Sequence, residues 1–196
     1  MKKKKPLTWG CLVLILGIFF LWLFIQVLFF FVNSIRYQPQ RVTNRQEFFQ
    51  EYAPLAQKIG KKYHLYPSVI LAQAALESNF GQSDLARVNK NFFGIKAKKG
   101  QGVSYATEEV ENGQRVTIQD NFESYKSPVD SFKHYGRLLS QAQRYQPVRE
   151  AKSAQEACHK LHPSGYSTDP GYGQRLVDLI KQYNLEVYDQ RIKDSK

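Results

Sequence analysis

The apolar residues of the chain form two patterns, one continuous stretch near the N-terminus and a periodic arrangement over the remainder. Residues 7–35 contain no charged side chain, and lysines occupy positions 2–5 directly before them. A helix of roughly 20 apolar residues crosses a hydrocarbon core about 30 Å thick, and flanking lysines stay on its cytoplasmic side. The sequence therefore predicts a basic cytoplasmic tail over residues 1–6, a transmembrane signal anchor over 7–35, and everything after it outside the cell.

A cleaved signal peptide is the alternative for this segment. Signal peptides carry an apolar region of about 7–15 residues followed by small residues at a cleavage site. Here the apolar stretch is longer, and it ends in Asn33-Ser34-Ile35 without such a site. The uncleaved anchor is therefore the stronger prediction, and residues 36–43 are expected to form a short polar linker.

Beyond the linker, apolar residues recur at helical spacing. They predict a helix over about residues 44–64 and a second over residues 67–77, with Pro67 suited to a first turn. Three more helices are expected toward the C-terminus, beginning at Ser127-Pro128, at the capping box Ser153-Ala154-Gln155-Glu156 and at Asp169-Pro170.

A β-hairpin is predicted between the second and third of these helices. Residues 103–110 and 115–119 favour strands, and Asn112-Gly113 between them is a strong two-residue turn signal. The result is an α+β, helix-dominated domain over residues 44–190, followed by a polar tail over 191–196.

The charge of the chain restricts its partners. The net charge is +11, to which the four N-terminal lysines contribute four. A basic domain suits an anionic polymer or an anionic lipid surface. Nucleic acid is the other usual partner of a basic protein, and an outward-facing anchor argues against it. Cys11 and Cys158 would be separated by the membrane, so the domain must be held together by its core and not by a disulfide.

Known signatures of metal and cofactor sites are missing from the sequence. The four histidines do not pair with Asp, Glu or Cys at zinc-ligand spacing. No phosphate-binding loop, dinucleotide fingerprint or G-x-S-x-G nucleophile turn occurs. We therefore expect neither a metal nor a cofactor, and the candidate chemistry lies with carboxylates and aromatic side chains.

Glu77 is the foremost candidate because it lies where the second predicted helix ends in Ser78-Asn79-Phe80-Gly81. The negative end of the helix dipole and an apolar wall both disfavour the charged carboxylate, so a raised pKa is expected. Such an acid can protonate a leaving group near neutral pH. An ordinary solvated glutamate in a last helical turn is the alternative.

Glycoside hydrolysis is the chemistry that needs such an acid together with a second group, which stabilises positive charge on the sugar or activates water. Glu108, Glu109 and Glu111 of the predicted hairpin are candidates for this second group. A solvated strand edge, where charges deter aggregation, is the alternative for each of them.

Five motifs follow one another along the chain in the order of a known family. They are Ala74-Ala75-Leu76-Glu77-Ser78-Asn79-Phe80-Gly81, Asn89-Lys90-Asn91-Phe92-Phe93-Gly94-Ile95-Lys96, Thr107-Glu108-Glu109 ahead of Asn112-Gly113, Phe122-Glu123-Ser124-Tyr125 with Ser127-Pro128, and Gly165-Tyr166-Ser167-Thr168-Asp169-Pro170-Gly171-Tyr172. Together they resemble the bacterial glucosaminidase domain, glycoside hydrolase family 73, which occurs in autolysins and in flagellar rod proteins. Two departures, Ser167 for Ala and Phe80 for Trp, touch neither carboxylate.

The resemblance implies a lysozyme-like helical core, with the hairpin as one wall of a cleft. It implies hydrolysis of the β-1,4 bond after N-acetylglucosamine in peptidoglycan, with Glu77 as general acid and Glu109 as second carboxylate. Together with the predicted anchor, this describes a membrane-anchored hydrolase. Strand alternation agrees with the assignment of Glu109, because positions 105, 107 and 109 share a face. The implied substrate-binding residues are Tyr125, Tyr166, Tyr172, Asn91, Phe93 and Phe80. Core packing is the alternative for the aromatic residues among them.

Two other functions remain open at this stage. A lytic transglycosylase or a muramidase can use one glutamate in a similar core, and a non-catalytic wall-binding protein could retain the fold. The stereochemistry also stays open, because retaining and inverting enzymes differ in carboxylate separation. Substrate-assisted attack by the N-acetyl group is a third route.

Overall fold

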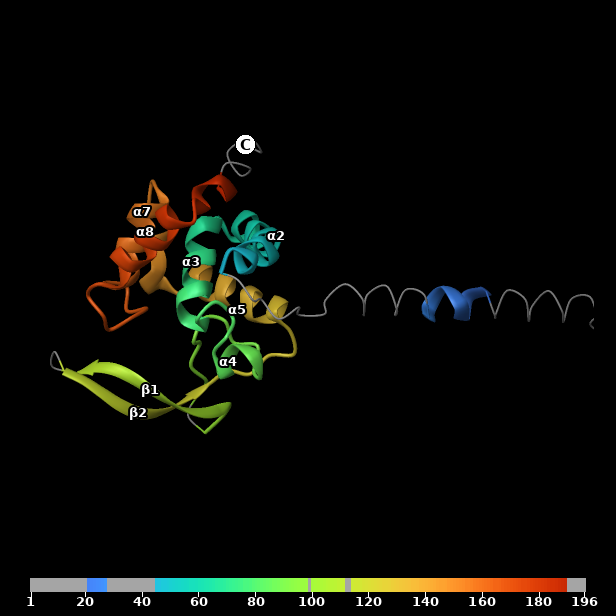
Figure 1. Ribbon diagram of the computed structural model, residues 1–196, viewed down its shortest axis with the longest axis horizontal. Helices are drawn as coiled ribbons and strands as arrows, with labels where there is room; N and C mark the ends of the chain where they lie inside the picture. Colours follow the sequence, from blue (N-terminus) through green and yellow to red (C-terminus); the bar gives the residue numbers. More distant parts are fainter. Residues whose placement is uncertain (1–20, 28–44, 99, 112–113, 190–196) are drawn as a thin grey trace, which may run out of the picture. The chain divides into compact units, whose positions relative to one another are not determined.

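The computed structural model describes residues 21–27, 45–98, 100–111 and 114–189, and between residues 107 and 116 it describes the backbone alone. Contacts divide the chain into two compact units, Met1–Arg41 and Val42–Lys196. The second unit contains the helices and strands on which the candidate chemistry lies (Figure 1).

The predicted transmembrane anchor over residues 7–35 lies mostly outside the described residues. Its described part, residues 21–27, is helical with exposed side chains. None of the helices in the described stretches has the length and apolar character needed to cross a bilayer. The anchor, the linker over 36–43 and the tails over 1–6 and 191–196 therefore stay predictions.

The second unit is helix-dominated and carries one two-stranded antiparallel sheet, which confirms the predicted α+β class. Its elements in order are α2 (Arg45–Tyr63), α3 (Pro67–Ser78), α4 (Asp84–Arg87), β1 (Val103–Glu111), β2 (Gln114–Phe122), α5 (Pro128–Gln141), η1 (Gln143–Tyr145), α6 (Gln146–Arg149), α7 (Ala154–Leu161), α8 (Tyr172–Gln182) and η2 (Leu185–Tyr188). The five expected helices correspond to α2, α3, α5, α7 and α8. The last begins later than expected, because Asp169 forms a turn by accepting a hydrogen bond from the Gly171 N–H at 2.7 Å.

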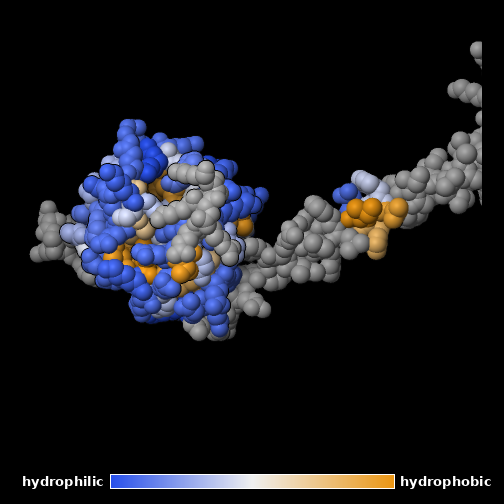
Figure 2. All heavy atoms as spheres, turned by 90° about the horizontal axis from the view of Figure 1, so that it is seen from above, coloured by the Kyte–Doolittle hydropathy of each residue, from blue (hydrophilic) through white to orange (hydrophobic). Residues whose placement is uncertain are grey.

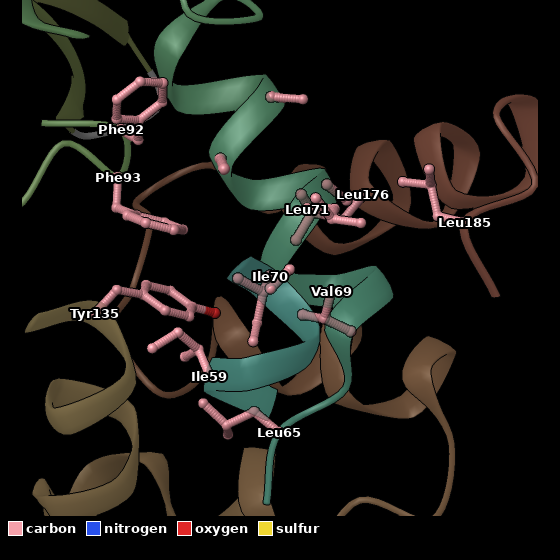
Figure 3. Close-up of a cluster of buried hydrophobic side chains, with 14 of the residues drawn as sticks. Ile59, Leu65, Val69, Ile70, Leu71, Phe92, Phe93, Tyr135, Leu176 and Leu185 are labelled. Atoms are coloured by element: carbon pink, nitrogen blue, oxygen red, sulfur yellow. The ribbon is translucent and has the colours of Figure 1, made fainter. Parts of the chain in front are cut away.

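Helix α3 forms the centre of the domain. Ten of its twelve residues are buried, as expected for a helix that is apolar around its whole circumference. It packs against α2, α7, α8 and η2, and Figure 1 shows it between α2 on one side and α7 and α8 on the other. Val69, Ile70 and Leu71 of α3 contribute to the hydrophobic cluster drawn in Figure 3.

The N-terminus of α3 is held by a residue from the far end of the domain. Asp189, directly after η2, accepts hydrogen bonds from the Ser68 N–H at 2.8 Å and from the Ser68 hydroxyl at 2.6 Å. A carboxylate there satisfies otherwise unpaired backbone donors and lies at the positive end of the helix dipole. This contact joins two residues 121 positions apart and fixes the axial position of α3.

The hairpin of β1 and β2 extends away from the helices (Figure 1). Its register pairs Val103 with Phe122 and Glu111 with Gln114, which confirms the predicted pairing of the two strands. The predicted turn residues Asn112 and Gly113 lie outside the described residues. At its base, Ala97 donates a backbone hydrogen bond to Asn121 at 2.8 Å. This contact between described residues ties the base of the hairpin to the rest of the domain.

The surface of the domain is mainly hydrophilic on the face seen in Figure 2, with limited apolar areas between polar side chains. Among the described residues of this domain, the exposed large apolar side chains are Val88 and Val187, which are 68% and 43% exposed. Most of the large apolar side chains described in this domain are therefore buried in its core.

We expect Asp189→Ala to lower the free energy of unfolding by about 1–2 kcal/mol, because α3 loses its cap. Urea unfolding followed by circular dichroism measures this change. The matched control is Asp178→Ala on the exposed face of α8, where a change within about 0.5 kcal/mol is expected. Equal losses for the two variants would show that the Asp189 contact does not hold α3.

Candidate active site

Glu77 lies in the last turn of α3, where the sequence predicted the helix to end. Asn79 takes the left-handed conformation that stops the helix, with φ of 48°. Ser78 closes the turn, since its hydroxyl donates to the Ala74 carbonyl and accepts from the Gly81 N–H at 2.7 Å. These contacts fix the backbone from which the half-buried carboxylate of Glu77 projects.

Phe80 secures this turn from within the core. It also has a positive φ, 55°, which is strained for a bulky residue. Its ring packs edge-on against Phe48 and Phe49 of α2. The guanidinium of Arg45, at the start of the same helix, lies 4.6 Å from the centroid of the Phe80 ring. Only 7% of Phe80 is exposed, so the structure gives this predicted substrate-binding residue the role of holding the turn.

The two oxygens of the Glu77 carboxylate have different surroundings. The hydroxyl of Tyr172, at the start of α8, donates a hydrogen bond of 2.7 Å to Oε1. On the other side, a Cβ added at Gly94 would lie 3.5 Å from Oε2. Gly94 has a φ of +60°, which favours glycine, and it places no side chain beside Oε2.

Asn91 shapes the loop that brings Gly94 to the carboxylate. Its amide nitrogen donates to the carbonyls of Ile95 and Glu123, at 2.9 and 3.0 Å. Its amide oxygen accepts from the backbone N–H groups of Phe93 and Ile95, at 3.3 and 3.1 Å. The side chain is completely buried. The structure therefore gives Asn91 the task of folding this loop, although the sequence analysis placed it at the substrate.

Phe93 is likewise part of the core. Its ring stacks on Tyr135 at 4.1 Å between centroids and meets Phe132 edge-on, and only 2% of it is exposed (Figure 3). Its carbonyl oxygen faces the other way and accepts a hydrogen bond of 3.0 Å from the Tyr166 hydroxyl. Phe93 thus contributes a backbone group to the site, while its side chain packs inward.

Tyr166 and Tyr172, two of the implied substrate-binding residues, lie together near Glu77. Their rings stack with centroids 5.7 Å apart. Burial raises the pKa of both phenols well above the ordinary value, and the nearby Glu77 raises each pKa further. Both hydroxyls therefore remain protonated and act as hydrogen-bond donors.

Behind Tyr172 lies a buried polar group that the sequence analysis did not single out. The amide nitrogen of Gln73 donates a 3.0 Å hydrogen bond to the Tyr172 hydroxyl oxygen, and the Tyr135 hydroxyl donates to the Gln73 amide oxygen. Gln73 is fully buried one helical turn before Glu77. A lone amide in an otherwise apolar helix, four residues before the candidate acid, was the signal that could have identified it.

Tyr125 lies on the connection between β2 and α5. Its hydroxyl pairs with His134 Nδ1 at 2.8 Å, and its backbone N–H donates to the Asn89 carbonyl at 2.8 Å. Burial raises the pKa of Tyr125 and lowers that of His134, so a protonated phenol donates this hydrogen bond to a neutral imidazole. These two hydrogen bonds hold the half-buried Tyr125 side chain in place.

Glu109 lies in β1, where its backbone is paired with Val116. Its side chain is outside the described part of the structure, so its assignment as second carboxylate stays a prediction. In the same strand, the Tyr105 hydroxyl donates to Asn89 Oδ1 at 2.8 Å, which directs this face of the strand base toward the loop that leads to Gly94. Among the described side chains, no three of His, Cys, Asp and Glu come together as a potential metal site.

Comparison with known proteins gives a consistent set of matches. The family model described as mannosyl-glycoprotein endo-beta-N-acetylglucosaminidase matches residues 53–185. The chain is 36% identical over 163 residues to exo-glucosaminidase LytG of Bacillus subtilis (strain 168), covering 80% of this chain and 58% of that protein. It is 38% identical over 160 residues to a probable N-acetylmuramidase of Lactococcus lactis subsp. cremoris (strain MG1363), covering 76% and 36%.

A solved structure agrees with these sequence matches. The catalytic domain of the autolysin Auto from Listeria monocytogenes superposes with a TM-score of 0.64 at 36% identity, covering 80% of this chain and 94% of that chain. The two sequence relatives named above are longer than the region they share with this chain, which spans 58% of one and 36% of the other. The similarity thus concerns one domain of those proteins.

Replacing Asn91 by Ala should lower the free energy of unfolding by about 3 kcal/mol or more, because several buried backbone groups lose their partners. Urea unfolding followed by circular dichroism provides the measurement, with Gln174→Ala on the exposed face of α8 as the amide control. If Asn91→Ala were as stable as the control, Asn91 would not be the residue that folds this loop.

Proposed function

Since this chain belongs to the glucosaminidase family, glycoside hydrolase family 73, we propose that it hydrolyses the β-1,4 bond after N-acetylglucosamine in peptidoglycan. The observation that carries the proposal is the half-buried carboxylate of Glu77, with the Tyr172 hydroxyl 2.7 Å from Oε1 and Gly94 beside Oε2. This arrangement is suited to general acid catalysis, because the Tyr172 hydroxyl holds one carboxyl oxygen and Gly94 adds no side chain beside the other.

In the proposed reaction Glu77 donates its proton to the glycosidic oxygen as the bond to the sugar carbon breaks. The acid becomes a carboxylate, and the sugar ring gains positive charge. Tyr172 then stabilises the new carboxylate, since a hydrogen bond to the charged form is stronger than one to the neutral form. The protonated phenol therefore assists the step at the oxygen that does not face the leaving group.

We assign the second carboxylate to Glu109, which would activate water or stabilise the oxocarbenium-like state. The family motif supports this assignment, as does strand alternation, which places position 109 on the same face as Tyr105. The hairpin is tied to the core at its base, so a small bend there would change the distance between position 109 and Glu77. Closure of such elements over substrate is a common step in hydrolases.

Aromatic side chains around the acid are proposed to bind the sugars. Tyr166 and Tyr125 are both half-buried and held by hydrogen bonds, so each could present a ring face or edge to a glycan. Tyr172 is only 2% exposed and acts through Glu77. Asn91, Phe93 and Phe80 contribute indirectly by shaping the loop and the turn at the acid.

We further propose that residues 7–35 anchor the enzyme in a bacterial membrane, with the N-terminus in the cytoplasm and the domain outside. The support is the uncharged apolar stretch after four lysines. A basic domain held at the outer face of the membrane would lie next to anionic wall polymers.

Muramidase activity is the alternative that a specific observation favours, because the Lactococcus lactis relative is a probable N-acetylmuramidase. The acid would act in the same way on the neighbouring bond of the same strand. The choice depends on which sugar occupies the site before the bond, and the sugars released by the enzyme distinguish the two.

Glu77→Gln is expected to lower the release of reducing sugar from purified peptidoglycan by about 10²–10⁴-fold. The amide keeps the shape and can still accept the Tyr172 hydrogen bond, so folding should be retained and circular dichroism should not change. Glu186→Gln, on the exposed surface of η2, serves as the matched control with normal activity.

Near-normal activity of Glu77→Gln would contradict the assignment of the acid. Binding of peptidoglycan by the wild type without release of reducing sugar would instead indicate a wall-binding protein.

A further inference from the structure

We propose that Gln73 and Tyr135 are positioning residues for the acid, because they fix the direction of a buried hydrogen-bond chain so that Tyr172 must donate to Glu77. The inference rests on the proposed function of Glu77 and adds two residues that neither contact substrate nor belong to a family motif identified above. Its physical basis is the single proton of each phenol and the fixed donor and acceptor ends of one amide.

The chain of hydrogen bonds links three helices through the core. The Tyr135 hydroxyl, from α5, donates to Gln73 Oε1 on α3, and Gln73 Nε2 donates to the Tyr172 hydroxyl oxygen on α8 at 3.0 Å. The Tyr172 hydroxyl then donates to Glu77 Oε1 at 2.7 Å. Each step runs in the same direction, toward the carboxylate.

The direction follows from the donors available. An amide has one accepting oxygen and one donating nitrogen, so an oxygen turned to Tyr135 places the nitrogen at Tyr172. The hydroxyl oxygen of Tyr172 then accepts from Gln73, and its only proton must point elsewhere, to Glu77. The reverse amide orientation would aim Nε2 at Tyr135 and deprive the buried Tyr135 proton of its acceptor, at a cost typical of an unsatisfied polar group.

Packing keeps these groups from rearranging. The rings of Tyr135 and Phe93 stack at 4.1 Å, and Figure 3 shows the Tyr135 hydroxyl pointing inward, toward α3. Gln73 and Tyr135 are completely buried, and Tyr172 is stacked on Tyr166. Among the described residues, every buried side-chain nitrogen and oxygen has a hydrogen-bond partner. With the Gln73 amide in this orientation, the polar side-chain groups of Tyr135, Gln73 and Tyr172 all have hydrogen-bond partners.

The fixed direction supplies a hydrogen-bond donor to Oε1 of Glu77. When the Glu77 proton passes to the glycosidic oxygen, the new carboxylate is therefore already held at Oε1. Burial raises the pKa of Tyr172, Tyr166 and Tyr135, and the nearby Glu77 raises each pKa further, so these three phenols stay neutral beside the acid.

The test is Tyr135→Phe, which removes the hydroxyl and keeps the ring that stacks on Phe93. Without this donor the Gln73 amide can reverse, and Tyr172 can donate to Gln73 instead of Glu77. Loss of a donor to the carboxylate raises its pKa, so the alkaline limb of kcat/KM on soluble peptidoglycan fragments should move up by about one pH unit. We also expect kcat to fall by about tenfold with little change in KM.

A double-mutant comparison separates this role from general destabilisation. Tyr172→Phe should move the alkaline limb in the same direction, and adding Tyr135→Phe to it should produce no further movement, because the chain acts only through Tyr172. Tyr145→Phe is the matched control, since Tyr145 is another buried tyrosine outside the chain, and its limb should stay in place.

Two outcomes would overturn the proposal. One is a Tyr135→Phe enzyme whose alkaline limb of kcat/KM is unchanged. The other is a Tyr135→Phe substitution that moves this limb equally in the wild type and in the Tyr172→Phe variant. If Glu77→Gln abolishes hydrolysis while either outcome is found, the proposed function stands and the role of the chain is wrong. If Glu77→Gln remains active, the proposed function itself fails.

Discussion

The burial of α3 on all sides is the constraint on which the rest of the structure depends. A helix without a solvent-facing stripe must be covered by other elements, and α2, α7, α8 and η2 together cover it. Its polar groups can then emerge only at its ends or pair inside the core. Asp189 caps one end, Glu77 projects from the other, and Gln73 is paired between them.

The site combines an acid held on this rigid helix with a candidate partner on a hairpin tied at its base. Tyr172 holds the acid in place, because its hydroxyl donates a hydrogen bond to Glu77 and accepts one from the Gln73 amide. Rigid placement of the acid is useful in catalysis, since small errors in distance cost large factors in rate. If the hairpin closes on the substrate, it can bring Glu109 to the reaction while Glu77 stays fixed on α3.

Much of the fold could be predicted from the sequence, because helical periodicity, the cap residues and Asn112-Gly113 are local signals. The short helices α4 and α6 could not be predicted, because four residues are too few to show a helical repeat of apolar positions. Glu77 was identified from its position at a helix end, whereas Gln73 and Tyr135 pair across 62 residues of sequence. Asn91 and Phe93 fall within a motif, and a motif does not tell a residue that folds a loop from one that touches substrate.

The sugar at the newly formed reducing end tests the central claim most directly. Peptidoglycan fragments released by the wild-type enzyme would be reduced with borohydride and their terminal sugars identified by mass spectrometry. Our account predicts reduced N-acetylglucosamine at these ends, and its loss from the Glu77→Gln digest. Reduced N-acetylmuramic acid would indicate a muramidase and anhydro-muramic ends a transglycosylase, and either result would contradict the proposed bond specificity.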